Sequence, residues 1–182
     1  MASCFISTGY TLDCRTASTG GLKSMWILGG SGNSITGYTA SNGEVTAIGG
    51  TGTWFKFELP KQSASLTETL GVNTTSQSVT FQPELVVNLP KLQYELRDVF
   101  VDLVSQNEIY ALVEDNNSRY WLVFLDNGGQ VSAGSLASGL AYTDLNGATV
   151  TMSGGEPTSI REVQIATTID AVFTTGGFTF ES

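Results

Sequence analysis

Alternating hydrophobic and polar positions predict a chain built mainly from short β-strands. The clearest case is residues 53–59, where Phe55, Phe57 and Leu59 share one face and Trp54 lies on the other with charged residues. A period of two with one apolar face is typical of a half-buried strand. An uninterrupted apolar run at 120–125 indicates a strand covered on both faces. Further strands are predicted at residues 22–28, 34–39, 44–48, 108–113, 119–125, 148–152, 160–165 and 171–173.

A long hairpin is predicted from residues 64–72 and 78–89, which flank a polar turn at residues 73–77. Pro83 cannot donate to a strand ladder, so it predicts a bulge or a sheet edge at that point. At about 3.3 Å per residue the arms would reach roughly 30 Å, which is long for a compact sandwich. The polar face of the second arm consists of Thr80, Gln82, Glu84 and Asn88.

One amphipathic helix is predicted over residues 90–107. Its apolar positions recur at helical spacing and form a single stripe, and Pro90 fits the first turn. A stripe this wide is expected to lie on a sheet, which makes this an ordinary packing helix. The stripe consists of Leu92, Leu96, Val99, Phe100, Leu103 and Val104.

Length and composition indicate one domain spanning residues 1–182. Residues 1–20 are predicted to form an N-terminal arm, and residues 174–182 a tail that is flexible or ordered by partners. Only 14% of the residues are charged, while 21 are glycine, which favours strands and turns and a surface partly covered by neighbours. No apolar run is long enough for a membrane span and no signal peptide is evident, so synthesis in the cytoplasm is expected.

The net charge is −9 and is concentrated after residue 101, where the sequence has ten acidic residues and only two basic ones, Arg119 and Arg161. Since no basic patch exists, ordinary binding to a phosphate backbone is not expected. The acidity fits either plain solubility or a surface that must not adhere to nucleic acid.

Catalytic and metal-binding signatures are missing. The chain has no histidine, which removes the commonest general base and most zinc sites. Residues 115–119 lack the glycine and the distal glutamate of a calcium loop and are better interpreted as a hairpin tip. Cys4 and Cys14 favour two reduced thiols, with a disulfide as the alternative. We therefore predict no enzyme, no metal and no cofactor.

Several segments together resemble one protein family. They occur in the order ISTGYTLDCR at 6–15, WFKFELPK at 54–61, SLTET at 65–69, VVNLPKL at 86–92, IYALVEDN at 109–116, RYWL at 119–122, GLAYTDLNG at 139–147 and TVTMSGGEP at 149–157. This order is similar to that in tail tube proteins of tailed bacteriophages.

The resemblance implies a β-sandwich or small β-barrel with one packing helix and a long hairpin. Six copies would form a ring, the hairpin sheets would join into an inner barrel, and stacked rings would form the virion's tail tube. The partners would be the chain itself, other tail proteins, and double-stranded DNA passing through without specific binding. Ring-to-ring contacts would involve both termini and residues 31–40, 73–77 and 128–139.

The channel of such a tube is expected to be lined by Thr80, Gln82, Glu84 and Glu68. Glu84 is the better acidic candidate, because Glu68 shares its face with leucines. Two alternatives are a ring that does not polymerise, such as a tail terminator, connector or hub, and a sandwich that binds a glycan or receptor. The second alternative needs exposed tryptophans at Trp26, Trp54 or Trp121, for which a core position is the favoured interpretation.

Overall fold

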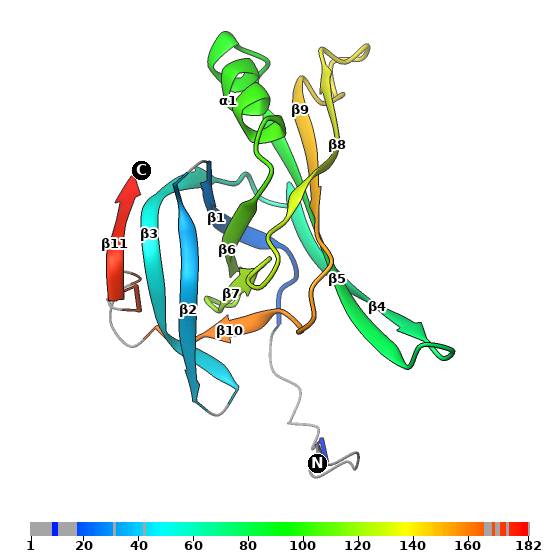
Figure 1. Cartoon of the computed structure of the whole chain (residues 1–182). Helices are drawn as coiled ribbons and strands as arrows, with labels where there is room; N and C mark the ends of the chain where they lie inside the picture. The colour runs from blue at the N-terminus through cyan, green and yellow to red at the C-terminus, as the bar shows by residue number, and fades with distance from the viewer. Residues whose placement is uncertain are drawn as a thin grey trace.

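The computed structural model describes residues 9–10, 18–30, 32–41, 43–165, 169, 172–173 and 175–181. The expectation of a mainly β fold with one helix is confirmed. The strands are gathered in two sheets, a rolled sheet of seven and a separate sheet of four (Figure 1). Most of the predicted N-terminal arm, including Cys4 and Cys14, lies outside the described residues.

The larger sheet closes into a small barrel. β1 (Leu22–Gly29) pairs with β6 (Ile109–Asp115) on one side and with β3 (Glu44–Glu58) on the other. β7 (Tyr120–Val123) and β10 (Arg161–Val163) complete the circuit from β6 back to β3. The two predicted strands 44–48 and 53–59 are thus one long strand, which also pairs with β2 (Ser34–Ser41) and β11 (Thr175–Glu181).

Glycine lets β3 pass close to β2 in the middle of this long strand. Gly50 has a φ of +155°, and a Cβ there would overlap the carbonyl oxygen of Ser34. A side chain at this position would therefore push the two strands apart.

The second sheet is antiparallel throughout, in the order β4–β5–β9–β8. β4 (Ala64–Asn73) and β5 (Ser78–Pro90) form the predicted long hairpin, which projects from the body in Figure 1. β9 (Gly147–Ser153) pairs with the inner half of β5, and β8 (Gln130–Ala137) forms the far edge.

Two separate cores explain the apolar runs in β1, β6 and β7. One core fills the barrel and includes Trp26, Leu112 and Leu122; the other lies between the barrel wall and the four-stranded sheet and includes Ile27, Ala111 and Leu85. Successive side chains of a strand point to opposite faces, so β1 and β6 contribute to both cores. The prediction that residues 120–125 are covered on both faces is confirmed for residues 122–125, which are buried in one core or the other, whereas Tyr120 and Trp121 are only partly buried.

The two cores correct the predicted faces of residues 53–59. Trp54 is fully buried in the barrel, whereas Phe55 is exposed and Phe57 packs from outside against the second core. The expectation of a single apolar face was wrong, because each face of β3 has its own apolar environment along part of its length.

The helix α1 (Tyr94–Val104) is shorter than the predicted 90–107. Pro90 does not start it, because β5 continues through Pro90, which pairs with Gly147. Lys91 then has a φ of +67° and Gln93 is extended, so helical geometry begins only at residue 94. The helix packs on β8 and β9 as expected, with Phe100 close to Gly134, but both ends of its apolar stripe remain exposed.

The C-terminal segment differs from the predicted flexible tail. Residues 175–181 form β11, parallel to β3. Phe178 and Phe180 alternate along it and reach Trp54, with ring centroids 6.2 Å apart in both cases. Their apolar contact with the barrel core supplies a reason for this segment to dock. The predicted strand at 171–173 is not confirmed at its described residues, Val172 and Phe173, which lie in a turn.

We predict that the root and the tip of the hairpin contribute very differently to folding. Leu85→Ala, at a fully buried position, should lower the free energy of unfolding by about 2–5 kcal/mol. Val79→Ala, on the same face of the same strand but half-exposed, should change it by less than about 0.5 kcal/mol. Urea unfolding of dilute protein measures both, and equal losses would contradict the described packing.

Candidate functional site

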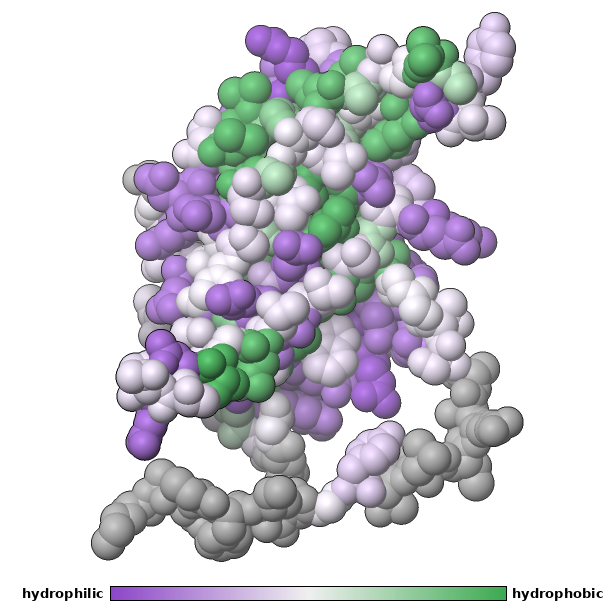
Figure 2. Space-filling view, turned by 90° about the vertical axis from the view of Figure 1, so that its right-hand side faces the viewer, coloured by the Kyte–Doolittle hydropathy of each residue, from purple (hydrophilic) through white to green (hydrophobic). Residues whose placement is uncertain are grey.

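The outward face of the four-stranded sheet is polar and almost free of charge. The register aligns Thr67, Glu84, Ser153 and Gln130 in one row across the four strands. Glu84 is the only charged side chain on this face; the other members are mostly Ser, Thr, Asn and Gln. Figure 2 views this side of the molecule, and hydrophobic side chains gather near its upper end and at its lower left. A face of this kind stays hydrated and offers no cation to a phosphate group.

The sheet brings together three of the four predicted channel residues. Thr80, Gln82 and Glu84 are exposed on the outward face of β5. Glu68 lies on the opposite face, where its carboxylate accepts hydrogen bonds from Ser159 Oγ (2.6 Å) and the Ile160 N–H (2.8 Å). Glu68 therefore attaches the hairpin to the chain beyond β9, and it does not belong to the same surface as Glu84.

Backbone hydrogen bonds show which groups reach the sheet edges. Phe81 and Glu156 exchange two bonds, of 2.9 and 2.8 Å, so odd-numbered residues of β5 direct their backbone groups toward the β9 side. Even-numbered ones face β4, as the 2.8 Å bond from the Asn88 N–H to the Ser63 carbonyl confirms. By the same alternation, outward N–H and C=O groups belong to Leu66, Glu68, Leu70 and Val72 on β4, and to Gly134 and Leu136 on β8.

Both edges carry few of the features that prevent strands from pairing between molecules, which here are an irregular register in β8 between Val131 and Ala133 and the inward-pointing Glu68 on β4. β4 contains one charged residue, Glu68, and β8 contains none; neither contains lysine or proline. In the part of the chain that the structure describes, no strand pairs with either outer edge. Open edges of this length normally invite another strand, so the four-stranded sheet is a surface suited to assembly.

The outer half of the hairpin exposes apolar side chains on its inward face. Leu70, Val72 and Val79 have exposed fractions of 59%, 58% and 48%. They continue the face that carries Leu85 into the core, but they lie beyond the body of the molecule (Figure 1). Residues 69–82 contain no charged residue. None of the described parts of the chain covers this half of the hairpin.

Residues 154–160 form hydrogen bonds with the hairpin at its root, and we call this segment the bracket. The Gly154 N–H donates to the Pro83 carbonyl (3.3 Å), next to the paired Phe81 and Glu156. Because the backbone nitrogen of Pro83 faces this side and has no hydrogen, regular pairing with β9 ends here. The prediction that Pro83 marks an interruption is confirmed for the β9 side, while the β4 ladder passes it without a break. This bracket sets the direction in which the hairpin leaves the sheet.

The carboxylate of Glu156 holds a second turn to this bracket. Its side chain accepts hydrogen bonds from the N–H groups of Asp126 (2.8 Å) and Asn127 (3.2 Å). Burial raises the pKa of Glu156, the two backbone donors oppose that rise, and the nearby charge of Asp126 adds to it. The turn after β7 and the root of the hairpin thus share one buried acid.

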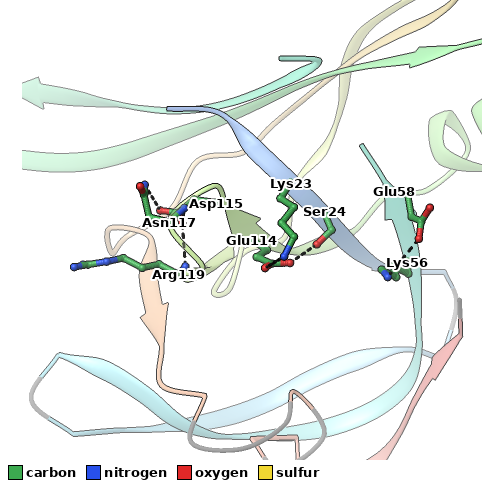
Figure 3. A network of polar contacts seen from close by, with 8 residues as sticks. All are labelled: Lys23, Ser24, Lys56, Glu58, Glu114, Asp115, Asn117 and Arg119. Atoms are coloured by element: carbon green, nitrogen blue, oxygen red, sulfur yellow. Dashed lines mark hydrogen bonds and ion pairs between the residues drawn. The ribbon is translucent and has the colours of Figure 1, made fainter. Parts of the chain in front are cut away.

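Other polar groups serve the barrel itself (Figure 3). The buried Glu114 accepts hydrogen bonds from Lys23 Nζ and Ser24 Oγ, both at 2.7 Å. The hydrogen bond to Glu114 is also the main cause that raises the pKa of Lys23. Asp115 accepts from the backbone N–H groups of Asn117 (2.7 Å) and Arg119 (2.9 Å), as expected for a hairpin tip and not for a calcium loop.

Two of the three tryptophans are not available for ligand binding. Trp26 and Trp54 are buried in the barrel and Trp121 is partly buried against the second core, which confirms the core interpretation for the first two. Among the described residues, no group of three or more acidic or cysteine side chains could hold a metal. None of the helices described is long and apolar enough to cross a membrane.

The structure also revises the predicted contact loops. Most of residues 31–40 and of residues 128–139 belong to β2 and β8, and of the third segment residues 74–77 form a connecting turn. Residues 140–146, most of the loop between β8 and β9, were not among the contact segments predicted from the sequence. A signal was present, because residues 130–143 contain no charged side chain.

We predict that Glu156 makes stability fall as the pH rises. A carboxyl group with a raised pKa in the folded state favours folding most at pH values below its unfolded pKa, and this contribution is lost as the pH passes the folded pKa. Wild type should therefore lose stability relative to Glu156→Gln as the pH rises above the ordinary glutamate pKa of about 4.3. Urea unfolding at a series of pH values measures the difference.

Glu156→Ala is the companion variant. It leaves two backbone donors without a partner and should cost about 1–3 kcal/mol at neutral pH, more than Glu156→Gln. Equal stability of the two variants at all pH values would contradict the described hydrogen bonds.

Comparison with known proteins found no relative: no protein-family model matches the chain, and no match was found among curated proteins or solved structures.

Proposed function

We propose that this chain is a structural protein of a bacteriophage tail that assembles into rings, with the rings stacked into a tube for genome delivery. The observation that carries the proposal is the four-stranded sheet, with two long open edges and an outward face whose only charge is Glu84. The family resemblance of the sequence is the second support. The proposed role is that of a non-enzymatic virion component, made in the host cytoplasm, without cofactors.

The strand order is suited to closing a ring. Because the sheet has four strands and each neighbouring pair is antiparallel, its edge strands β4 and β8 run in opposite directions. A second copy related by rotation can then place its β8 beside β4 of the first and continue the antiparallel pattern. Repetition of this heterologous contact around an axis removes every open edge.

The size of such a ring fits a DNA channel. Six copies would join about 24 strands, and at about 4.8 Å between strands the inner barrel would have a circumference of about 115 Å and a diameter of about 37 Å. With the outward face toward the channel, the copies of Glu84 form a ring of carboxylates that repels phosphates. The surrounding hydroxyl and amide groups hold water without gripping the duplex.

The proposal favours a polymerising tube over a glycan-binding or receptor-binding sandwich, since Trp26 and Trp54 are buried. A single-ring terminator, connector or hub would use the same lateral contact. Electron microscopy separates these roles, because a single-ring protein gives isolated rings where a tube protein gives stacks. Other tail proteins would be the partners at the two ends.

We predict rings or tubes in concentrated purified protein, and their loss in Leu136→Pro. The N–H of Leu136 points away from β9, so proline removes a donor of the open edge and keeps the ladder within the molecule. Leu136→Val is the matched control and should assemble. Negative-stain microscopy with analytical ultracentrifugation measures assembly, and circular dichroism checks folding. Monomeric wild-type protein at high concentration would refute the proposal.

We also predict that Glu84→Lys leaves assembly intact but makes the tubes retain duplex DNA. Each ring would gain several cations in the channel, and binding to phosphates should weaken steeply with added salt. Glu95→Lys, at an exposed position on α1, makes the same change of charge elsewhere and is the control. Co-sedimentation of DNA at low and high salt measures retention, and equal retention by both variants would remove Glu84 from the channel.

A further inference from the structure

Two apolar patches lie at opposite ends of the four-stranded sheet. The loop patch is on residues 138–146, where Leu140 and Tyr142 are fully exposed. The hairpin patch consists of Leu70, Val72 and Val79. In Figure 1 the loop stands above β8 and β9 and the hairpin tip lies at the lower right, so one molecule presents the two patches in opposite directions.

The loop is held in shape by hydrogen bonds among its own residues and at its base. Asp144 Oδ2 accepts hydrogen bonds from the N–H groups of Leu140 (2.9 Å) and Ala141 (2.8 Å). The Asp144 N–H in turn donates to the Ala141 carbonyl (3.0 Å). At the base, the Lys91 N–H donates to the Asn146 carbonyl (2.6 Å). Leu140 and Tyr142 are therefore carried outward by an ordered protrusion, and little conformational entropy is lost when it binds.

The distribution of charge makes these two patches suitable for contact between copies. The chain has a net charge of −9, so two copies repel each other where their carboxylates approach. Residues 69–82 and residues 130–143 have no charged side chain. A contact between these two segments brings apolar surfaces together, and the charged side chain of the loop, Asp144, already has its carboxylate paired with the N–H groups of Leu140 and Ala141.

We propose that the loop patch of one copy binds the hairpin patch of a second copy in the adjacent ring. The contact is heterologous, because the two patches are different surfaces at opposite ends of one sheet. A heterologous contact that does not close propagates along an axis, here the long axis of the sheet. The inference rests on the proposed tube function and names the surfaces that join one ring to the next.

The size of the patches predicts the order of assembly. Two fully exposed side chains, one of them aromatic, offer on the order of 300–400 Å². A stable pairwise interface buries about 800 Å² on each partner, so one such contact does not hold two monomers together. A ring presents several copies of it at once, and their combined strength is far greater. Rings formed through β4 and β8 should therefore precede stacking.

Three serine substitutions test the contact. Tyr142→Ser and Val72→Ser should leave rings intact and lower the fraction of protein in tubes by about tenfold or more, as expected for loss of a central anchor. Tyr94→Ser removes another exposed tyrosine, on α1, and should leave tubes unchanged. Electron microscopy and sedimentation measure rings and tubes separately. Normal tubes from Tyr142→Ser, or loss of tubes in Tyr94→Ser as well, would overturn the assignment to the loop.

Cross-linking tests the pairing of the two patches directly. Cysteines are introduced as Val72→Cys and Tyr142→Cys, in a chain where Cys4 and Cys14 are replaced by serine. Oxidation of assembled tubes should give a ladder of covalent oligomers longer than dimers, because each copy uses one cysteine upward and one downward. Either single cysteine should give no ladder. Dimers only, or no product from tubes, would overturn the proposal.

The same experiments separate this inference from the proposed function. If unsubstituted protein forms no rings, the tube function fails, whatever the cross-links show. If rings and tubes form but neither Tyr142→Ser nor the cysteine pair behaves as expected, the ring function stands and this contact is wrong.

Discussion

The wall formed by β1 and β6 is the element on which the rest of the structure depends. Side chains of these two strands point alternately into the barrel core and into the core beneath the four-stranded sheet, so the wall packs against a hydrophobic core on each face. A strand buried in this way cannot slip by one residue without exchanging the contents of the two cores. The barrel and the second sheet are thereby fixed relative to each other, and the outward face of that sheet remains free.

Local sequence patterns were sufficient to predict several strands. They were insufficient where the burial or the boundary of an element depends on segments far away in the sequence. The hairpin of residues 64–89 follows from alternation, and the covered strand near Leu122 follows from an uninterrupted apolar run. Pro90 was misplaced because proline fits the first turn of a helix as well as the end of a strand. The face of β3 that carries Trp54 was interpreted as polar, because a single alternating pattern cannot indicate that this strand has one core on each side.

The residues of the candidate site also fall into those that the sequence pattern could predict and those that it could not. Thr80, Gln82 and Glu84 could be placed on one face from their spacing, and the structure keeps them together. Glu156 could not be found, because its role depends on a turn about thirty residues away in sequence. The protruding loop at Leu140 carried a readable signal in its lack of charge, but its shape depends on the hydrogen bonds of Asp144.

Pro83 has a mechanical consequence. It ends the regular pairing with β9, and beyond Phe81, which still pairs with Glu156, the hairpin continues as a ribbon of two strands. Such ribbons twist more and bend more easily than wider sheets. If adjacent rings contact one another through these ribbons, each ring is supported by flexible two-stranded segments that are attached to the body at Glu68 and Glu156. A tube built this way would flex at the joints between rings while the bore of each ring keeps its diameter.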